Sequence, residues 1–375
     1  MTAMTNIPLV NLAAQYKQIQ HEITPVVEGI MRQSEFIGGR PVVRFEQAYA
    51  EYCNAKYCIG VGNGTDALFL ALKASGVGSG DEVVLPAMSF VATAEAISMT
   101  GATPVFADIL PKAFTIAPQE IERCITNRTK AILPVHLYGC PADMNIINTI
   151  AKQHDLHVIQ DAAQAHGAAI NDAKIADFGC CCYSFYPGKN LGAYGDAGAV
   201  VANDEDFSVL VRKWANHGRT DKYNHEFPGI NSRLDGIQAA VLSVKLKYLE
   251  HWTRARQALA KRYEQLLAHL PAIRCPNIPD GKNHVFHLYA IQCENRDQLR
   301  SFLVDRGIQT GIHYPIAQPF LPAYASMGHT PQDFPVSFEL QNTTLSLPLF
   351  PELTEEQQTY IVNSISEWYA KQGAK

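Results

Sequence analysis

Two polar side chains follow mainly apolar segments of the chain, in places where they could take part in a reaction. Asp161 follows the run 158–160, and Lys189 lies 28 residues further along, after a second run at 180–185. A lysine amine can form a Schiff base with an aldehyde, and a carboxylate can pair with a protonated ring nitrogen. An enzyme that depends on pyridoxal 5′-phosphate (PLP) requires both groups. We therefore predict that Lys189 and Asp161 are catalytic, although a lone lysine is usually a solvated surface charge.

A glycine-rich turn provides a candidate phosphate site. Gly64, Thr65 and Asp66 follow a strand-like segment and open a helical pattern. The free N–H groups and the positive end of such a helix suit a phosphate. The alternative is a simple helix cap by Asn63 or Thr65. A dinucleotide-binding motif would need a third glycine at position 65, which makes a nucleotide-dependent dehydrogenase the weaker interpretation.

Three further side chains are candidates for contacts with PLP. Ser184 lies five residues before Lys189, where its hydroxyl could reach the same phosphate. Phe90 follows another apolar segment and could stack on the pyridine ring. Gln164, three residues after Asp161, could donate a hydrogen bond to the phenolic oxygen of the cofactor. Each has an ordinary alternative, as a turn residue, a core aromatic and a surface amide respectively.

Polar and aromatic residues also gather between regular elements, where they could bind the diphosphate or carboxylate of a substrate. One group lies in the segment 217–225, one precedes a long helical pattern, and one lies near the C-terminal end. The candidates are Arg219, Tyr223, His225, Arg233, His313 and Tyr314. A solvated connection or an ordinary turn is the alternative for each group.

The elements that must position these residues form an alternating pattern. Short apolar runs separated by helical patterns lie at 57–61, 82–86, 103–108, 131–136, 157–160, 180–185 and 198–202. Such runs are typical of an α/β fold, in which helices cover both faces of a mainly parallel sheet. Ligands of such sheets bind at the carboxyl ends of the strands, and Thr65, Asp161 and Lys189 all follow such ends.

The pattern changes in the last third of the chain. Residues 236–266 form one long helical pattern, followed by strand patterns at 287–291 and 345–347 and a closing helix at 352–371. We therefore expect a large α/β domain at 1–250 and a smaller α+β domain at 251–375.

Composition excludes several other classes of protein. The formal net charge is −5 over 375 residues without a basic block, so neither nucleic acid nor an anionic membrane is an expected partner. No apolar run approaches the roughly 20 residues that span a bilayer, and residues 1–6 do not resemble a signal peptide. We expect a cytoplasmic protein. The nine cysteines are scattered, and the adjacent Cys180, Cys181 and Cys182 would alternate in direction along a strand, so neither a metal site nor a disulfide framework is expected.

Taken together, the motifs resemble those of the DegT/DnrJ/StrS nucleotide-sugar aminotransferases. They are residues 184–192 (Ser-Phe-Tyr-Pro-Gly-Lys-Asn-Leu-Gly), 62–68, 161–167, 231–235 and 311–315, and they follow the family order over nearly the whole chain. The resemblance implies a fold-type I PLP enzyme with a mainly parallel seven-stranded sheet between helices and a smaller C-terminal α+β domain. It also implies a homodimer with active sites at the subunit interface.

The resemblance implies a role for each matching residue. Lys189 would bind the cofactor and transfer protons, Asp161 would hold the ring nitrogen N1, and Gln164 would hold the O3′ oxygen. The remaining cofactor contacts would be Gly64, Thr65, Asp66 and Ser184 at the phosphate, Phe90 on the ring, and Asn231 from the partner subunit. His313, Tyr314 and parts of the 217–225 loop would lie near the sugar nucleotide.

Details of two motifs indicate a substrate. Pro-Gly-Lys-Asn-Leu-Gly and the Lys-Tyr-x-His loop resemble members that aminate C3 of dTDP-linked 3-keto-6-deoxyhexoses, and we expect L-glutamate as the amino donor. The alternative within the family is a C4 aminotransferase acting on a UDP- or GDP-4-keto sugar. Some members carry histidine in place of the lysine and dehydrate sugars, whereas this chain keeps Lys189. Alternatives of other classes are a non-catalytic PLP-binding regulator and another PLP reaction, such as decarboxylation or desulfuration.

Overall fold

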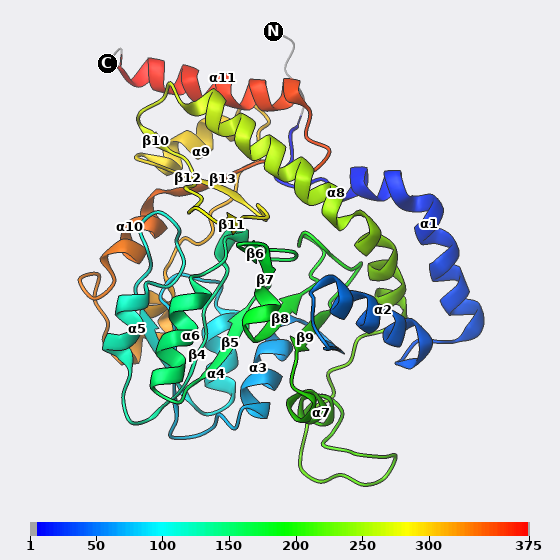
Figure 1. The fold of residues 1–375 in the computed structure, drawn as a ribbon. Coiled ribbons are helices and arrows are strands. Elements are labelled where there is room, and N and C mark those ends of the chain that lie inside the picture. Colours follow the sequence, from blue (N-terminus) through cyan, green and yellow to red (C-terminus); the bar gives the residue numbers. More distant parts are fainter. Residues whose placement is uncertain (1–5, 374–375) are drawn as a thin grey trace.

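A central seven-stranded sheet with helices on both faces forms the largest part of the molecule (Figure 1). The computed structural model describes residues 6–373. In spatial order the strands are β1 (Tyr57–Val61), β9 (Gly198–Ala202), β8 (Cys180–Ser184), β5 (His157–Asp161), β4 (Thr129–Ile132), β2 (Glu82–Pro86) and β3 (Thr103–Ala107). Strand β9 runs antiparallel to β1 and β8, and the other neighbouring strands are parallel. The predicted mainly parallel seven-stranded sheet is therefore confirmed.

Strand β2 illustrates why these runs are apolar throughout. Its residues Val83 and Leu85 belong to the core shared with the helices of one face, whereas Val84 belongs to the core on the other face. Because both faces are covered, every position of such a strand is buried. The helices of this part are α1 (Leu12–Gln33), α2 (Gly39–Tyr52), α3 (Gly64–Ala74), α4 (Ala92–Met99), α5 (Pro118–Cys124), α6 (Met144–Gln153), α7 (Glu205–Trp214) and the start of α8 (Gly236–Leu267).

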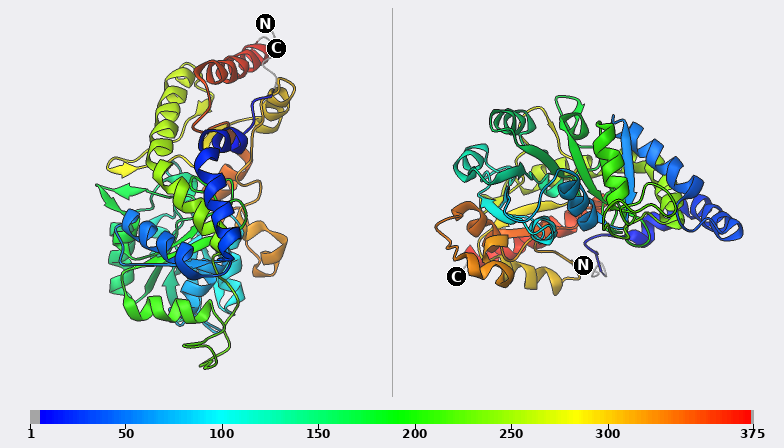
Figure 2. Two further views of the ribbon diagram at one scale, coloured as in Figure 1. Left: turned by 90° about the vertical axis from the view of Figure 1, so that its right-hand side faces the viewer. Right: turned by 90° about the horizontal axis from the view of Figure 1, so that it is seen from below.

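A smaller α+β region lies beyond the central sheet, and α8 runs from one region to the other (Figures 1 and 2). It contains a three-stranded antiparallel sheet, β10 (Ile273–Arg274), β12 (Tyr289–Cys293) and β13 (Thr344–Leu347). Its helices are α9 (Arg296–Val304), α10 (Pro335–Thr343) and α11 (Glu355–Gly373). A third small sheet joins β11 (Lys282–Asn283) to β6 (Ala169–Ile170) and β7 (Ala173–Lys174).

The two regions exchange segments of chain. Ile7, near the N-terminal end, packs in the C-terminal core, and its N–H donates to the Gly307 carbonyl at 2.7 Å. Conversely, Ala317 packs with the core beside β2, and the neighbouring Gln318 donates from Nε2 to the Pro86 carbonyl at 3.0 Å. A domain boundary at residue 250, which would fall within α8, stays a prediction.

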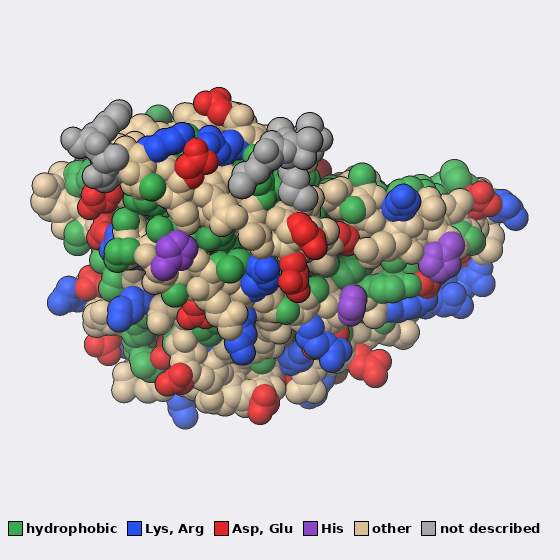
Figure 3. Space-filling model, turned by 90° about the horizontal axis from the view of Figure 1, so that it is seen from above, with side chains coloured by type: hydrophobic (Ala, Val, Ile, Leu, Met, Phe, Trp, Pro, Cys, Tyr) green, Lys and Arg blue, Asp and Glu red, His purple; other side chains and the backbone are tan. Residues whose placement is uncertain are grey.

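Helix hydropathy, surface charge and cysteine pairing are the remaining general features of the described residues. No helix within residues 6–373 is long and apolar enough to cross a membrane. On the face shown in Figure 3, acidic and basic side chains are interspersed. All nine cysteines are free, and Cys181 and Cys182 lie in separate cores because successive strand residues point to opposite faces.

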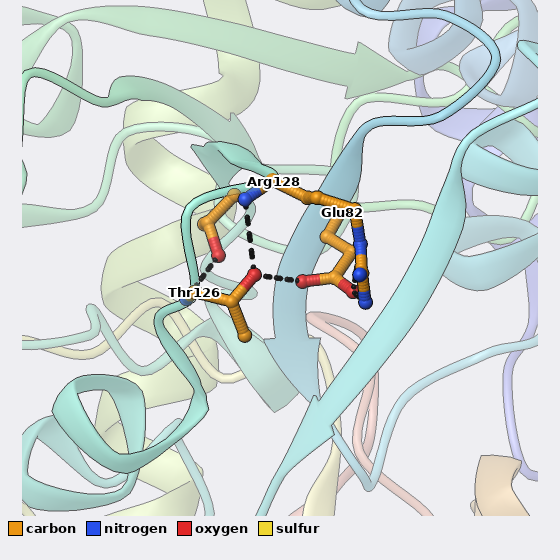
Figure 4. A network of polar contacts seen from close by, with 4 residues as sticks. Glu82, Thr126 and Arg128 are labelled. Atoms are coloured by element: carbon orange, nitrogen blue, oxygen red, sulfur yellow. Dashed lines mark hydrogen bonds and ion pairs between the residues drawn. The ribbon is translucent and has the colours of Figure 1, made fainter.

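A polar network ties the amino ends of β2 and β4 together, at the opposite end of the strands from Asp161 and Lys189 (Figure 4). The buried Glu82 carboxylate accepts hydrogen bonds from Thr126 Oγ1 at 2.5 Å and from Arg128 Nε at 2.9 Å. Burial by itself would raise the pKa of Glu82, but the bonds from Thr126 and Arg128 outweigh burial and lower that pKa below its ordinary value.

We expect Glu82→Gln to destabilise the fold by about 1–2 kcal/mol, at the low end for charged hydrogen bonds because Arg128 is mostly exposed. The melting temperature should fall by about 1–3 °C in a calorimetric scan. Since the folded-state pKa is lowered, the Glu82 carboxylate stabilises the fold above its unfolded pKa, and this gain is lost as the pH falls through the folded value. The difference in melting temperature between wild type and Glu82→Gln should therefore shrink in acid. A difference that grows in acid would contradict the stabilising role of the Glu82 carboxylate.

Candidate active site

Lys189 lies in a tight loop that follows β8. Its N–H donates to the Tyr186 carbonyl at 2.8 Å. A Cβ at Gly192 would lie 2.2 Å from the Pro187 oxygen, so the loop closes on itself only because residue 192 is glycine. The buried Lys245 of α8 donates from Nζ to the Gly192 carbonyl at 2.7 Å and thereby fastens the loop to that helix. The loop thus presents Lys189 from a fixed backbone.

Asp161 ends β5, the neighbour of β8, and its carboxylate is buried. Thr93 Oγ1 donates to Oδ2 at 2.8 Å, and the Ala163 N–H donates to Oδ1 at 3.1 Å. Burial raises the pKa of Asp161, while these two hydrogen bonds and the charge of Lys189 oppose the rise. Burial lowers the pKa of Lys189 to about 8, and the charge of Asp161 opposes that lowering. The two predicted catalytic groups therefore lie close enough to interact.

Gln164 and Tyr314 meet beside this pair. Gln164 Oε1 accepts from the Tyr138 N–H at 2.6 Å, and Gln164 Nε2 donates to the Tyr314 hydroxyl at 3.0 Å. The carbonyl of Gln164 is thus occupied, which turns its NH₂ group toward the site. Phe90 is 54% exposed, although it follows a buried strand, and its ring centre lies 5.7 Å from that of Tyr314. An exposed ring in this position is available to stack on a flat ligand.

His313 also lies within reach of the charge on Lys189. Its Nδ1 is 2.9 Å from Ser346 Oγ, and its backbone carbonyl accepts from the Tyr138 hydroxyl. Burial lowers the pKa of His313 to about 4, and the Lys189 charge contributes to the lowering. The imidazole is therefore neutral at physiological pH. In the small region, His313 and Tyr314 contribute to the same site as the residues of the central sheet.

Three residues of this site were not predicted from the sequence. Thr93 and Tyr138 donate hydrogen bonds to Asp161 and Gln164 respectively. The partly buried His287 has a pKa well below its ordinary value, because of the burial of its ring and, to a lesser extent, the Lys189 charge. His287 Nδ1 lies 3.3 Å from Asn190 Oδ1, next to the lysine. Of these three residues, only Thr93 could have been suspected from the sequence, because it lies four residues after Ser89 and close to Phe90.

The amino end of α3 forms a cradle next to this cluster. Asn63 caps the helix, as one of the alternatives predicted, by accepting the Asp66 N–H at 2.8 Å. Within residues 6–373 the N–H groups of Gly64 and Thr65 donate to no acceptor. A Cβ at Gly64 would lie 2.6 Å from the Ser184 Cβ, so the helix end abuts that serine. Two free N–H groups, a positive helix end and a serine hydroxyl fit the phosphate of PLP.

Asp66 has other partners in this structure. Its carboxylate accepts from Ser232 Oγ at 2.6 Å, and Ser232 Oγ in turn accepts from the Gly62 N–H at 2.9 Å. These bonds connect the cradle to the segment that carries Asn231 and Arg233. Asn231 is exposed and Arg233 is partly buried. A phosphate contact by Asp66 stays a prediction.

The structure does not bring the 217–225 loop to the lysine of its own chain. The loop follows α7 and projects from the body of the molecule (Figure 1). Its bonds are largely internal: Arg219 pairs with His225, whose Nδ1 lies 2.9 Å from the His217 carbonyl oxygen. Tyr223 is 81% exposed. Substrate contacts by Arg219, Tyr223 and His225 stay predictions.

We expect Gly64→Ala to weaken PLP binding at least about tenfold, because the new methyl group would collide with Ser184 and displace the helix end from the phosphate. Gly29→Ala in α1 is the matched control, since nothing lies within 4 Å of a Cβ there. Fluorescence titration of the apoprotein with PLP gives both dissociation constants. Equal constants for the two variants would argue against the cradle.

Comparison with known proteins agrees with this arrangement. Residues 17–366 match the DegT/DnrJ/EryC1/StrS aminotransferase family. A "pleiotropic regulatory protein" of Geobacillus stearothermophilus is 46% identical over 97% of this chain and 99% of its own. A dTDP-3-amino-3,4,6-trideoxy-alpha-D-glucose transaminase of Streptomyces venezuelae is 41% identical over 96% of both chains. The crystal structure of S. venezuelae DesV superposes with a TM-score of 0.96 at 40% identity, covering 97% of this chain and 99% of DesV.

These matches span almost the full length of the chain and include the segments that carry Lys189, Asp161 and the α3 cradle. Aminotransferases of this family depend on PLP, and the free cradle and the paired lysine and acid suit that cofactor. The chain belongs to the DegT/DnrJ/EryC1/StrS aminotransferase family and is a PLP-dependent sugar aminotransferase.

Proposed function

We propose that the protein transfers an amino group from L-glutamate to C3 of a dTDP-linked 3-keto-6-deoxyhexose. The observation that carries the proposal is the placement of Asp161 at the end of β5 and of Lys189 in the loop after the neighbouring strand β8, beside the α3 cradle. The substrate class is supported by the motifs around Lys189 and by the name of the Streptomyces transaminase. The proposed catalytic residues are Lys189 and Asp161.

PLP, when bound, supplies an aldehyde and an electron-accepting ring. With a folded-state pKa of about 8, about a tenth of the Lys189 amines are neutral at pH 7, far more than at the ordinary lysine pKa, and Nζ of this form can act as nucleophile and base. In one half of the reaction Nζ takes a proton from the α-carbon of glutamate. In the other half it delivers a proton to the sugar carbon, and the same group therefore serves both directions. The Asp161 carboxylate would hold a positive charge on the ring nitrogen of the bound cofactor.

The remaining site residues orient the ligands. The N–H groups of Gly64 and Thr65, with the Ser184 hydroxyl, would anchor the phosphate. The Gln164 amide would donate to the phenolic oxygen, and the exposed Phe90 ring would cover one face of the cofactor ring. His313 and Tyr314 would line the sugar side of the site, together with Arg233.

We further propose a homodimer that shares its active sites. Exposed apolar side chains cluster where α1 passes into α2: Met31, Phe36, Ile37 and Val43. Figure 3 shows apolar side chains along the projecting arm formed by these helices. A second copy of the chain would cover this surface and bring its 217–225 loop and Asn231 to the first copy's lysine. Such reciprocal contacts are typical of twofold interfaces.

Complementation between two inactive variants tests the shared site. Lys189→Ala and Asn231→Ala would be produced together with different tags, and the mixed dimers purified by both tags in turn. In random pairing, half of the dimers are mixed and each has one intact site, so the unfractionated pool should regain about a quarter of wild-type activity. Purified mixed dimers without activity, or a monomer in analytical ultracentrifugation, would contradict the proposal.

The reaction itself is tested by the visible spectrum of the holoenzyme. L-Glutamate should shift the cofactor band from about 410–420 nm to about 330 nm, and dTDP-3-keto-6-deoxyhexose should reverse the shift. A response to a UDP- or GDP-4-keto sugar in place of the 3-keto sugar would identify the C4 alternative. The name of the Geobacillus relative favours one second candidate, a regulator that binds PLP without turnover. That candidate requires a bound cofactor that does not respond to glutamate.

A further inference from the structure

Two buried hydroxyl groups form a chain behind the carboxylate of Asp161. Thr93 Oγ1 lies 2.8 Å from Asp161 Oδ2, and Ser89 Oγ lies 2.8 Å from Thr93 Oγ1. Thr93 is inaccessible to solvent and Ser89 nearly so. The other carboxylate oxygen, Oδ1, is served by the Ala163 N–H. Each oxygen of Asp161 therefore has a donor from the protein before any ligand binds.

The direction of these bonds follows from the charge of Asp161. An ionised carboxylate only accepts hydrogen bonds, and a hydroxyl has a single hydrogen to donate. The hydrogen of Thr93 must therefore point to Asp161, and the hydrogen of Ser89 must point to Thr93. In such a chain each bond polarises the next, so Ser89 strengthens the bond that Thr93 makes.

The backbone that carries these hydroxyls is fixed at both ends. The Thr93 N–H donates to the Phe90 carbonyl at 3.1 Å, which closes the turn between β2 and α4. The fully buried Gln318 bridges this turn, with Nε2 bound to the Pro86 carbonyl at 3.0 Å and Oε1 bound to the Ala94 N–H at 3.3 Å. The turn before α4 therefore carries the exposed Phe90 ring, and the first turn of α4 carries the hydroxyl that contacts Asp161.

The physical effect of Thr93 is to stabilise a buried negative charge. A carboxylate without donors in a dry site tends to bind a proton, since burial raises its pKa. A protonated acid could not hold a positive charge on the cofactor nitrogen, and the ring would then withdraw electrons less strongly. Charge-assisted hydrogen bonds such as that from Thr93 oppose this loss.

We propose that Thr93, with Ser89 behind it, is a positioning residue that keeps Asp161 ionised and aimed at the cofactor ring nitrogen. The inference rests on the proposed role of Asp161 opposite that nitrogen. Thr93 touches neither the substrate nor the reacting atoms, and it acts through Asp161 alone.

The chain offers a matched set of variants for the test. Thr93→Val removes the hydroxyl at nearly constant volume, and Thr93→Ser keeps it. Thr115 is equally buried and its hydroxyl has no partner within the described residues, so Thr115→Val controls for burying one more methyl group. The holoenzymes would be reconstituted with PLP labelled with ¹⁵N in the ring. The ¹⁵N chemical shift reports protonation of that nitrogen directly, and stopped-flow absorbance gives the rate of the glutamate half-reaction.

We expect Thr93→Val to move the ¹⁵N shift toward that of an unprotonated ring and to slow the glutamate half-reaction by about 10–100-fold. Thr93→Ser should stay within about threefold of wild type, and Ser89→Ala should change both quantities in the same direction by a smaller amount. Thr115→Val should match wild type. Identical shifts and rates for Thr93→Val and Thr115→Val would overturn the inference.

Asp161→Asn separates this inference from the function on which it rests. If Asp161→Asn leaves the ¹⁵N shift unchanged, the proposed role of Asp161 itself is wrong. If Asp161→Asn moves the shift and Thr93→Val does not, only the role of Thr93 is wrong. Should Thr93→Val fail to fold, Ser89→Ala carries the test: a displaced ¹⁵N shift supports the inference, and an unchanged one overturns it.

Discussion

Lys189→Ala should reduce turnover by at least about 10³-fold, because the variant loses both the nucleophile and the proton-transfer group of the site. Lys189→Arg should not rescue activity, since a guanidinium stays protonated and cannot act as a base. PLP should still bind through the α3 cradle and Asp161, but should dissociate on gel filtration. Lys152→Ala, at an exposed position on α6, is the control. A Lys189→Ala enzyme with near wild-type transamination would refute the central assignment.

The pKa of Lys189 also predicts a pH dependence. Burial lowers this pKa to about 8, so the neutral, nucleophilic amine becomes the major form as the pH rises through about 8. Uptake of PLP by the apoprotein should accelerate over the same range, which stopped-flow absorbance at the cofactor band can follow. Because the folded-state pKa is lowered, the buried amine costs stability fully below pH about 8 and progressively less as the pH rises toward the ordinary lysine pKa, so Lys189→Met should raise the melting temperature of the apoprotein most below pH about 8. An uptake rate that is constant from pH 6 to 9 would contradict this prediction.

Asp161→Asn should slow the glutamate half-reaction by about 10²–10³-fold while leaving the fold intact. The amide is nearly isosteric but carries no charge to hold a positive ring nitrogen. Since burial raises the pKa of Asp161, the ionised carboxylate costs stability at neutral pH, and the neutral amide should not lower the melting temperature. Asp161→Glu keeps the charge, but its longer side chain displaces the carboxylate, and the variant should be impaired for that reason. Stopped-flow rates and calorimetry on the same samples distinguish lost chemistry from lost folding.

The expected effects of these variants rank Asp161 above Thr93 in importance for the reaction. Loss of Asp161 removes the charge itself, whereas loss of Thr93 weakens only the hydrogen bond that stabilises the charge. The effect of Thr93→Val on the ¹⁵N shift and on the rate of the glutamate half-reaction should therefore be smaller than that of Asp161→Asn. A larger effect of Thr93→Val would mean that the turn between β2 and α4 has lost its structure, and the far-ultraviolet circular dichroism spectrum would reveal that loss.

Much of this architecture could be predicted from the sequence, because local patterns report burial. The strands of the central sheet are apolar at successive positions, and six of the seven predicted runs coincide with strands to within a residue or two. The run predicted at 131–136 begins earlier in the structure, as β4 (Thr129–Ile132), and its register with β2 shifts near Glu82. The helix start at Gly64 was also predictable, since Asn63 is a strong cap and glycine tolerates the approach to Ser184.

Other features depended on the tertiary structure, since they join residues far apart in the chain. Thr93 and Asp161 are 68 residues apart, and Gln318 reaches Ala94 over 224 residues. Hydrophobic periodicity predicts that such residues are buried, but it does not predict which faces of the helices and strands pack against each other. The packing of Ile7 with the C-terminal core likewise joins residues that are far apart in the chain.

The sequence by itself determined the chemistry of this protein: a lysine and an acid that each follow an apolar strand, and a capped helix end for a phosphate. Parallel strands end at one edge of a sheet, so these residues come together when their strands are neighbours, as β5 and β8 are in the structure. Only the tertiary structure decided what surrounds them, including the Ser89–Thr93–Asp161 chain and the contact of Gln164 with Tyr314. Hydrogen bonds between distant side chains depend on distances of tenths of an ångström, which the order of residues does not encode.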